Sequence, residues 1–371
     1  MGTSSSKEKS SGQVLPKGDG PNLQPYHGKP IFYHFININA HIDVNTRFSF
    51  LHSDVSLRTT RIESYYPLLM QLYARGYQML TFVRLPGSVQ TFGFMATRHA
   101  EITIKYQGVF RKVSEEEINL DYELRVEKSI IVNQMFQSFD TPSATGVSNT
   151  HHIFQTIERV TQNGGRLVCI EVTGMMMDQQ QAQNTEFFLT GYSPITTIPV
   201  DVFYEVPNHP SAKQYTYQIL SLPVQTVFNP GLRQKLLTTC DWQGTMKQML
   251  GKGWRLVDVF MDMSSKFTNT GFMSTERKQN SLWIFEKPLS RIDDLTPKYQ
   301  GTVVEFWYEI SHQQNAGVTL TTSTPWEPAI NSMGKEGWEL VKILATSESK
   351  IKSMFQPTLK IKYMIFFQRK I

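Results

Sequence analysis

One pattern of apolar positions occurs four times along the chain, each time around a glycine. The glycines are Gly76, Gly164, Gly253 and Gly337, which stand 88, 89 and 84 residues apart. Apolar residues stand eleven, seven and four positions before each glycine, and three and four positions after it. Because an α-helix has 3.6 residues per turn, positions −11, −7 and −4 lie on one helical face. The sequence therefore predicts four amphipathic helices in a repeat of about 85–89 residues.

The residues around the helix ends predict where each helix starts and stops. A glycine after a helix commonly adopts positive φ, so we expect positive φ at Gly253 and Gly337. Asp241 is a good N-cap for the third helix. Thr324 and Glu327 form a capping-box pattern around Pro325 for the fourth. On the apolar face we expect the following side chains to be buried: Trp242, Met246, Leu256, Trp326, Ile330 and Leu340.

Apolar runs around each helix predict strands. One strand is expected before each helix, at 31–38, 122–132, 215–222 and 303–310, one after each glycine, and one at the end of each unit. The predicted fold class is α+β, with four degenerate β-α-β-β repeats whose helices pack on antiparallel-rich sheets. We expect loops at 137–149 and 175–182. The predicted division is a tail at 1–30 and repeats at 31–113, 122–204, 214–289 and 299–371.

Composition favours an interaction protein over an enzyme. Only two cysteines occur among 371 residues, which is typical of a reducing compartment. No apolar run approaches the roughly 18 residues of a membrane helix. Dinucleotide, Walker and zinc-protease motifs are missing. His151 and His152 could form a nucleophile or metal site with Cys169, but a histidine pair at a helix start is more often a surface feature. We expect no catalytic residue, no metal and no cofactor.

The N-terminal tail carries a lipidation pattern. Met1-Gly2-Thr3-Ser4-Ser5-Ser6-Lys7 fits the signal for myristoylation of Gly2, with Ser6 and Lys7 as its context. The tail is rich in small and polar residues, so we expect it to be disordered. The alternative is an ordinary soluble leader.

Basic residues gather at the other end of the chain. The net charge is +5, yet the segment from Lys342 to Ile371 alone carries +6. This segment can contact anionic lipids, or its lysines can be a solvated strand face that protects a sheet edge. The residues predicted to contact the membrane are Lys7, Lys9, Lys17, Lys360, Lys362 and Lys370.

The third and fourth units resemble the raftlin family. The resemblance rests on Asp241-Trp242, Gly271-Phe272, Leu282-Trp283-Ile284-Phe285-Glu286, Val303-Val304-Glu305-Phe306-Trp307, Gly337-Trp338 and Phe366-Phe367-Gln368-Arg369. It is clearest over residues 215–369 and at Gly2. At the position where raftlins carry a cysteine that takes palmitate, this chain has Thr3.

The resemblance implies a non-enzymatic scaffold of ordered plasma-membrane microdomains that supports receptor signalling or endocytic trafficking. Its expected location is the cytoplasmic face of the plasma membrane, with a cytosolic pool. Its expected partners are anionic membrane lipids and unidentified membrane receptor or trafficking proteins, and no nucleic acid is expected. The alternative is a soluble protein- or polyanion-binding module without a lipid anchor.

Overall fold

The computed structural model describes most of the chain after residue 27. The described ranges are 28–48, 53–59, 65–86, 89–92, 99–113, 122–137, 143–173, 195–209, 212–229, 235–271, 274–315, 317–322, 325–351 and 358–371. Residues 1–27 of the tail predicted at 1–30, and the predicted loop at 175–182, therefore lie outside the described residues.

The elements fall into four sequential units, which are numbered one to four below. Unit one comprises β1 (Tyr33–Phe48), β2 (Ser53–Thr59), α1 (Tyr66–Ala74), β3 (Tyr77–Arg84), β4 (Val89–Phe92) and β5 (His99–Lys112). Unit two comprises β6 (Tyr122–Gln137), β7 (Ser143–Asn149), α2 (His151–Gln162), β8 (Arg166–Val172) and β9 (Ile195–Pro207). Unit three comprises β10 (Tyr215–Asn229), β11 (Lys235–Thr239), α4 (Trp242–Leu250), β12 (Arg255–Gly271) and β13 (Ser274–Pro288). Unit four comprises β14 (Tyr299–Asn315), β15 (Gly317–Thr322), α5 (Glu327–Lys335), β16 (Glu339–Ile351) and β17 (Thr358–Lys370).

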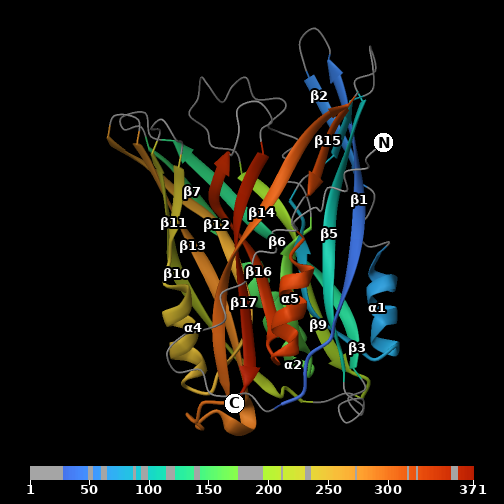
Figure 1. The fold of residues 1–371 in the computed structure, drawn as a ribbon, viewed down its shortest axis with the longest axis vertical. Coiled ribbons are helices and arrows are strands. Elements are labelled where there is room, and N and C mark those ends of the chain that lie inside the picture. The colour runs from blue at the N-terminus through green and yellow to red at the C-terminus, as the bar shows by residue number, and fades with distance from the viewer. Residues whose placement is uncertain are drawn as a thin grey trace, which may run out of the picture.

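The predicted fold class is wrong. The protein is mostly antiparallel β, built from long strands in curled sheets, and not an α+β array of helix-on-sheet repeats (Figure 1). The order within a unit also differs from β-α-β-β, because a short strand precedes every helix. In unit two this strand, β7, occupies most of the region predicted as a loop at 137–149. The short strands were missed because they have only five to seven residues and few apolar positions, too few for a clear periodic pattern.

Each unit uses the same strand pairing. The first strand forms an antiparallel hairpin with the short strand and pairs on its other side with the last strand of the unit. The last strand then pairs with the strand that follows the helix. Units four and one join in one sheet through β15 and β4, and units two and three join in another through β7 and β12. The four units therefore share two sheets in pairs, four with one and two with three.

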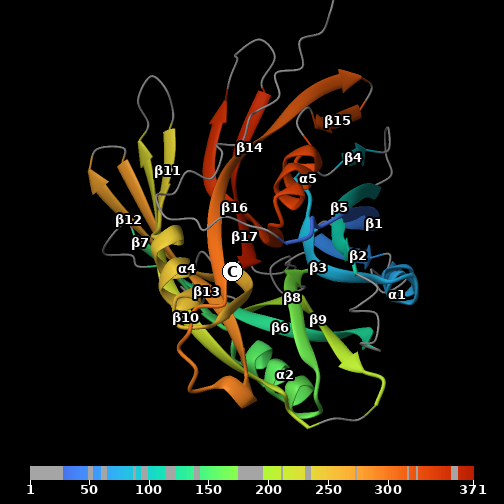
Figure 2. The ribbon, with the colours of Figure 1, turned by 60° about the horizontal axis from the view of Figure 1, so that its bottom comes forward.

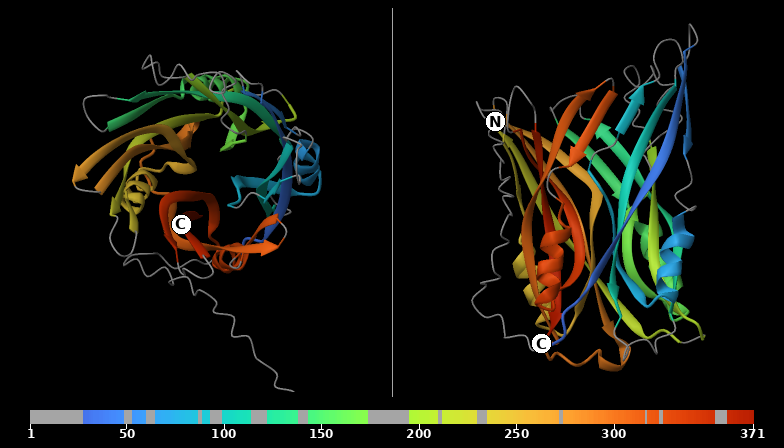
Figure 3. Two further views of the ribbon diagram at one scale, coloured as in Figure 1. Left: turned by 90° about the horizontal axis from the view of Figure 1, so that it is seen from above. Right: turned by 45° about the vertical axis from the view of Figure 1, so that its right-hand side comes forward.

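The four strands that follow the helices lie in the middle of the molecule. Viewed from above, β3, β8, β12 and β16 occupy the centre while the outer strands surround them (Figure 3). Contacts run from β3 to β8, from β8 to β12, from β12 to β16 and from β16 back to β3. The units are therefore arranged in a closed cyclic order, and the four helices lie around the outside (Figure 2).

A β-bulge occurs at the same place in every inner strand. The pairing register shifts at Leu80, Val168, Val257 and Val341, each four residues after the aligned glycine. A bulge adds one residue to one strand of a pair and re-aims the side chains beyond it. Each of these four residues packs in the core of the preceding unit, so Val168 of unit two lies in the core that surrounds α1. The hydrophobic cores are therefore shared between neighbouring units.

The predicted buried positions, the glycine stops and the Asp241 cap are confirmed. All six predicted core side chains are buried, including Trp242 at 8% and Trp326 at 1% exposure. All four aligned glycines have positive φ, between 75° and 80°. Asp241 caps α4 by accepting a hydrogen bond of 3.0 Å from the Gly244 amide. The capping box of the last helix is wrong: α5 begins at Glu327, whose side chain instead accepts from Gln107 at 2.9 Å.

The two glycines Gly76 and Gly253 provide a matched test of the helix stops. Their φ angles are +75° and +79°, but a Cβ on Gly253 would lie 2.9 Å and 3.0 Å from the backbone oxygens of Thr296 and Asp294. The nearest atom to a Cβ on Gly76 is the Lys112 Nζ at 3.4 Å. Left-handed backbone costs a non-glycine residue about 1–2 kcal/mol.

We expect Gly76→Ala to lower the free energy of unfolding by about that amount and Gly253→Ala by more. Urea denaturation of the two variants beside the parent measures this. Equal losses would show that the turn after α4 shifts to accept the methyl group.

Candidate functional site

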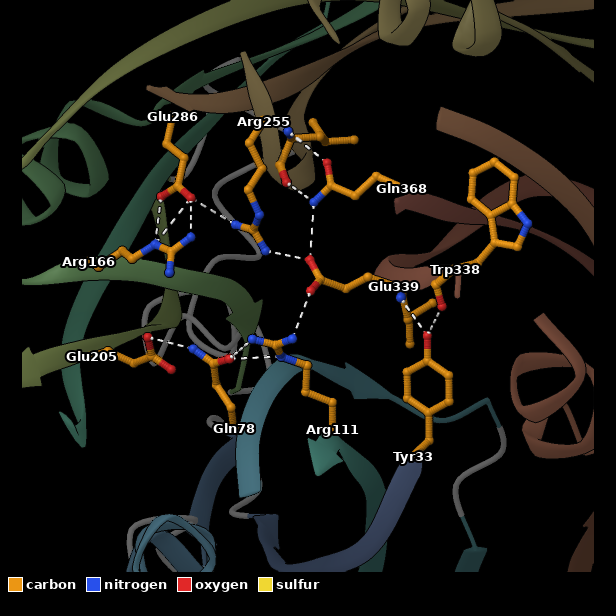
Figure 4. Close-up of polar contacts among 12 residues, drawn as sticks. Tyr33, Gln78, Arg111, Arg166, Glu205, Arg255, Glu286, Trp338, Glu339 and Gln368 are labelled. Carbon is orange, nitrogen blue, oxygen red and sulfur yellow. Dashed lines mark hydrogen bonds and ion pairs between the residues drawn. The ribbon is translucent and has the colours of Figure 1, made fainter. Parts of the chain in front are cut away.

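Eight polar side chains meet at the centre of the molecule, two from each unit. Within each unit, the two residues face each other across paired strands. We call this set the central polar ring (Figure 4). Its members are Gln78 and Arg111 of unit one, Arg166 and Glu205 of unit two, Arg255 and Glu286 of unit three, and Glu339 and Gln368 of unit four.

The central polar ring has a contact across every junction between units. Gln78 Nε2 donates to Glu205 Oε2 at 3.0 Å, which joins units one and two. Arg166 Nη2 lies 2.5 Å from Glu286 Oε1, which joins units two and three. The two remaining junctions have Glu339 in common: its oxygens lie 2.6 Å from Arg255 Nη2 and 3.7 Å from Arg111 Nη1. The ring therefore connects residues that are between 84 and 228 positions apart in the sequence.

The acidic members of the ring are held ionised by the arginines. Glu286 is 1% exposed, and burial by itself raises its pKa, but Arg166 and Arg255 hold that pKa below its ordinary value. Burial likewise raises the pKa of Glu339, and Arg255 and Arg111 lower it to about 2. Buried ion pairs of this kind fix geometry, because each charge loses solvation and is compensated only by its partner.

The ring faces a cavity of about 900 Å³. Ile31, Tyr122, Tyr215 and Tyr299, at the starts of the first strands, line it on one side of the ring. The four bulge residues, which are apolar, line it on the other. The cavity thus has a tyrosine-rich entrance, a polar middle and an apolar floor. Volumes of this size are typical of small-molecule sites.

Basic side chains predominate around the cavity. Of the described residues that line it, seven are basic and three are acidic. The basic ones are Lys29, Arg111, Lys112, Arg166, Arg255, Arg369 and Lys370. Lys112 and Lys370 are exposed. Arg166 lies over the ring of Tyr215, with its guanidinium carbon 4.9 Å from the ring centroid. The arrangement is chemically suited to binding an anion.

A second charged cluster lies deeper, on β8, β12 and β16. Lys342 Nζ is 3.1 Å from Asp258 Oδ1 and 3.7 Å from Glu171 Oε2, and it donates to the Ile170 carbonyl at 2.9 Å. Asp258 also accepts from the Ile170 amide at 2.6 Å. Lys342 and Asp258 are 4% and 0% exposed. In this cluster the charges of Lys342, Asp258 and Glu171 compensate one another within the core.

Glu171 gives the protein a predicted pH dependence. Burial raises its pKa from 4.5 to about 7, although Lys342 and Arg84 act to lower it, while Asp258 adds to the rise. Its folded-state pKa lies above the unfolded value, so the unfolded state releases the proton first as pH rises. Stability should therefore fall between about pH 4.5 and pH 7, with a slope of at most about 1.4 kcal/mol per pH unit.

Glu171→Gln removes this titration and should flatten that part of the profile. Chemical denaturation of both proteins at pH 5, 6 and 7 measures the difference. A difference in unfolding free energy that does not change with pH would contradict the assignment to Glu171.

Of the predicted membrane-contact residues, the structure describes Lys360, Lys362 and Lys370. Gly2, Ser6, Lys7, Lys9 and Lys17 lie outside the described residues. Lys360 pairs with Glu309, and Lys362 pairs with Glu305 at 2.6 Å and Glu348 at 3.4 Å. Lys370 lies at the far end of β17, at the cavity. These three lysines do not protect a sheet edge, because β17 lies between β14 and β16.

The histidines and the cysteine considered for catalysis occupy different environments. His151 and His152 are exposed at the start of α2. Cys169 is 0% exposed in the core around α1, and burial raises the pKa of its thiol well above its ordinary value. A buried thiol with a raised pKa is unreactive. Among the described residues, no group of three or more metal-binding side chains is placed to hold a metal ion.

In the part of the chain that the structure describes, no helix is both long and apolar enough to cross a bilayer.

Comparison of the chain with protein-family models, with curated proteins and with solved structures found no match. The resemblance to raftlins therefore stays a prediction.

The sequence analysis did not predict the central polar ring, although four of its eight residues occupy the same position in the repeat. Gln78, Arg166, Arg255 and Glu339 each stand two positions after an aligned glycine, so the alignment places a polar residue there in every unit. Polar residues at the start of an apolar strand are usually solvent-exposed, so the pattern by itself did not indicate burial. Their partners on the last strands have no common residue type or fixed spacing from the glycines.

Proposed function

We propose that this protein is a non-enzymatic, membrane-associated scaffold, similar to raftlins, at the cytoplasmic face of the plasma membrane. In this proposal the predicted myristoylation of Gly2 anchors it to ordered microdomains, where it supports receptor signalling or endocytic trafficking. Anionic lipids and membrane receptor or trafficking proteins are its proposed partners. The buried charges of the described body support a structural use of its polar groups, because the arginine–glutamate pairs join the four units.

One geometric observation carries the membrane proposal. Lys29 and Pro30, the last residues of the predicted tail, and Ile31, which follows them, line the cavity. They are held there by hydrogen bonds from the Ile31 amide to the Gly334 carbonyl, 2.8 Å, and from the Lys112 amide to the Phe32 carbonyl, 2.9 Å. A lipid on Gly2 would therefore draw the end of the molecule with exposed Lys112 and Lys370 towards the bilayer.

An electrostatic contribution to membrane binding is needed, because one myristoyl chain gives a partition constant of only about 10⁴ M⁻¹. Basic residues near an anionic surface add about 1 kcal/mol each. With Thr3 in place of an acylatable cysteine, charge is the available second contribution in the proposal.

We expect the myristoylated protein to bind phosphatidylserine liposomes in a salt-sensitive way, and Gly2→Ala to abolish binding. Lys112→Glu with Lys370→Glu should weaken it about tenfold or more, because each change reverses a charge at the end facing the lipid. The matched control is Lys266→Glu, an exposed lysine eleven residues along β12 from the cavity residue Arg255. Co-sedimentation at 50 and 300 mM salt measures all four proteins. Binding that survives Gly2→Ala would overturn the anchor, and equal losses in the double variant and the control would overturn the orientation.

The second candidate function is a soluble protein- or polyanion-binding module without a lipid anchor. The excess of basic residues around the cavity favours it independently of Gly2. Mass spectrometry of the protein purified from eukaryotic cells distinguishes the two: an unmodified Gly2 supports the module, and a myristoyl mass on Gly2 supports the scaffold.

A further inference from the structure

We propose that the central cavity is a binding site for a phosphorylated polyol, which enters past the tyrosines at its entrance. The proposal concerns the cavity alone and does not depend on a lipid anchor. It rests on three observations: a basic excess in the lining, acidic and amide acceptors set among the arginines, and aromatic side chains at the entrance.

The arginines Arg166 and Arg255 are held in the cavity wall by a carboxylate that does not itself line the cavity. Both bind Glu286, which is almost fully buried and is not among the residues that line the cavity. The three arginines of the central polar ring are balanced by its three glutamates. The net positive charge that favours a phosphate therefore comes from the lining residues outside the ring, where four basic residues exceed the single acid Glu123. The four are Lys29, Lys112, Arg369 and Lys370.

The acceptors in the wall favour a ligand with hydroxyl groups as well as phosphates. Glu205 and Glu339 line the cavity, and the arginine and glutamine donors of the ring use only part of their acceptor capacity. A carboxylate oxygen has two lone pairs and can accept again. A ligand that is only anionic would be repelled by these two carboxylates, whereas a polyol phosphate can donate its hydroxyls to them and place its phosphates on the basic residues.

The entrance tyrosines suit the same class of ligand. Tyr122 and Tyr299 are half-buried, and burial raises the pKa of each, so both are neutral hydroxyl donors near pH 7. Tyr215 lies beside them with its ring against Arg166. Aromatic faces at the mouth give apolar contact to the C–H face of a ring-shaped polyol, and the hydroxyls give hydrogen bonds.

The test uses isothermal titration calorimetry on the full chain in unacylated form, with inositol 1,4,5-trisphosphate, myo-inositol and inorganic phosphate as probes. We expect the trisphosphate to bind at least tenfold more tightly than phosphate, and myo-inositol not to bind measurably. Lys112→Gln with Lys370→Gln should weaken the trisphosphate at least tenfold, since a hydrogen bond to a charged group contributes about tenfold or more in affinity. Tyr122→Phe with Tyr299→Phe should weaken it about threefold to tenfold per lost hydrogen bond.

Lys266→Gln is the matched control, because it removes one exposed lysine away from the cavity lining. All the substitutions are at exposed or half-buried positions outside the central polar ring, and thermal melting checks that each variant is folded. Equal weakening by the control and by the lysine and tyrosine double variants, or equal affinity for the trisphosphate and inorganic phosphate, would overturn the proposal.

A second experiment, with lipid vesicles, distinguishes a lipid headgroup from a soluble polyol phosphate as the ligand. Phosphatidylcholine vesicles are prepared with a phosphoinositide or with phosphatidylserine at equal surface charge. A preference for the phosphoinositide that free trisphosphate removes by competition identifies a lipid headgroup. Binding of free trisphosphate without any vesicle preference identifies a soluble polyol phosphate. Failure of the trisphosphate to bind in either arm overturns the cavity site, and leaves the Gly2-dependent liposome binding to be judged on its own.

Discussion

Replacing Lys342 with methionine is expected to destabilise the protein by about 3–5 kcal/mol. Methionine keeps much of the side-chain volume but removes the only ammonium whose contacts with Asp258 and Glu171 are described. Asp258 is 0% exposed and would remain as an uncompensated buried carboxylate. The removal of one partner from a buried pair is costly because the other charge has already lost its solvation.

Chemical denaturation at pH 7 measures this loss, and a double-mutant cycle identifies its cause. Lys342→Met combined with Asp258→Asn should recover part of the stability, because the neutral amide still accepts from the Ile170 amide through one oxygen. If the double variant is as unstable as the sum of the two single variants, the pair is not coupled, and the loss comes from packing.

Trp326→Ala is expected to cost a similar amount, about 3–5 kcal/mol. Trp326 is 1% exposed and packs against Phe306, Tyr308 and Tyr363, with ring centroids between 5.1 and 6.4 Å away. Its Nε1 donates to Gln107 of β5 at 2.7 Å, across the junction between units four and one. The change therefore leaves a cavity and also a buried amide oxygen with one donor fewer.

Two further variants separate these contributions. Trp326→Phe keeps most of the ring but loses the donor, so it should cost less than the alanine variant. Phe32→Ala removes an aromatic side chain that is 68% exposed and should change stability by less than about 0.5 kcal/mol. Thermal and urea denaturation of the three variants are the measurements. A loss below about 1 kcal/mol for Trp326→Ala would contradict the packing described around α5.

The helices could be predicted from sequence because their signals are local. A residue at −11, −7 or −4 is on the buried face by helical geometry alone, whatever the rest of the chain does. The glycine stops are equally local, since positive φ is a property of one backbone position. Ile330 and Gly337 show both effects: the first is fully buried and the second has a φ of 76°.

The inner strands could not be predicted to the same level, because a bulge changes which residues face which way. Leu256 packs against its own helix, but Val257, the next residue, packs in the core of unit two. Simple alternation would have continued through Val257 and placed Asp258 on the opposite face from the one it occupies. Strand register depends on the pairing with β13, in which Leu256 faces Phe285, 29 residues along the chain, and this lies beyond the range of a local pattern.

The candidate site depends on such distant contacts even more strongly. Arg166 and Glu286 are 120 residues apart in the sequence, and Arg111 and Glu339 are 228 apart. From the sequence alone, each of these charged residues would have been predicted to lie on the surface. They become a single connected set, partly or fully buried, only because the four units close in cyclic order around the inner strands.

The sequence by itself determined the number of units, the face that each helix buries and the glycine at which each helix ends, because periodicity and backbone preference act within about a dozen residues. The tertiary structure alone decided that the strands join across units in two curled sheets and that each bulge residue enters the neighbouring core. It also decided that three lysines of the +6 segment, Lys342, Lys360 and Lys362, form ion pairs with acids, and that the cavity is lined by the charged ring. Those features arise where segments far apart in the chain pair as strands or form buried ion pairs. A local sequence pattern does not specify which strand or side chain will be the partner.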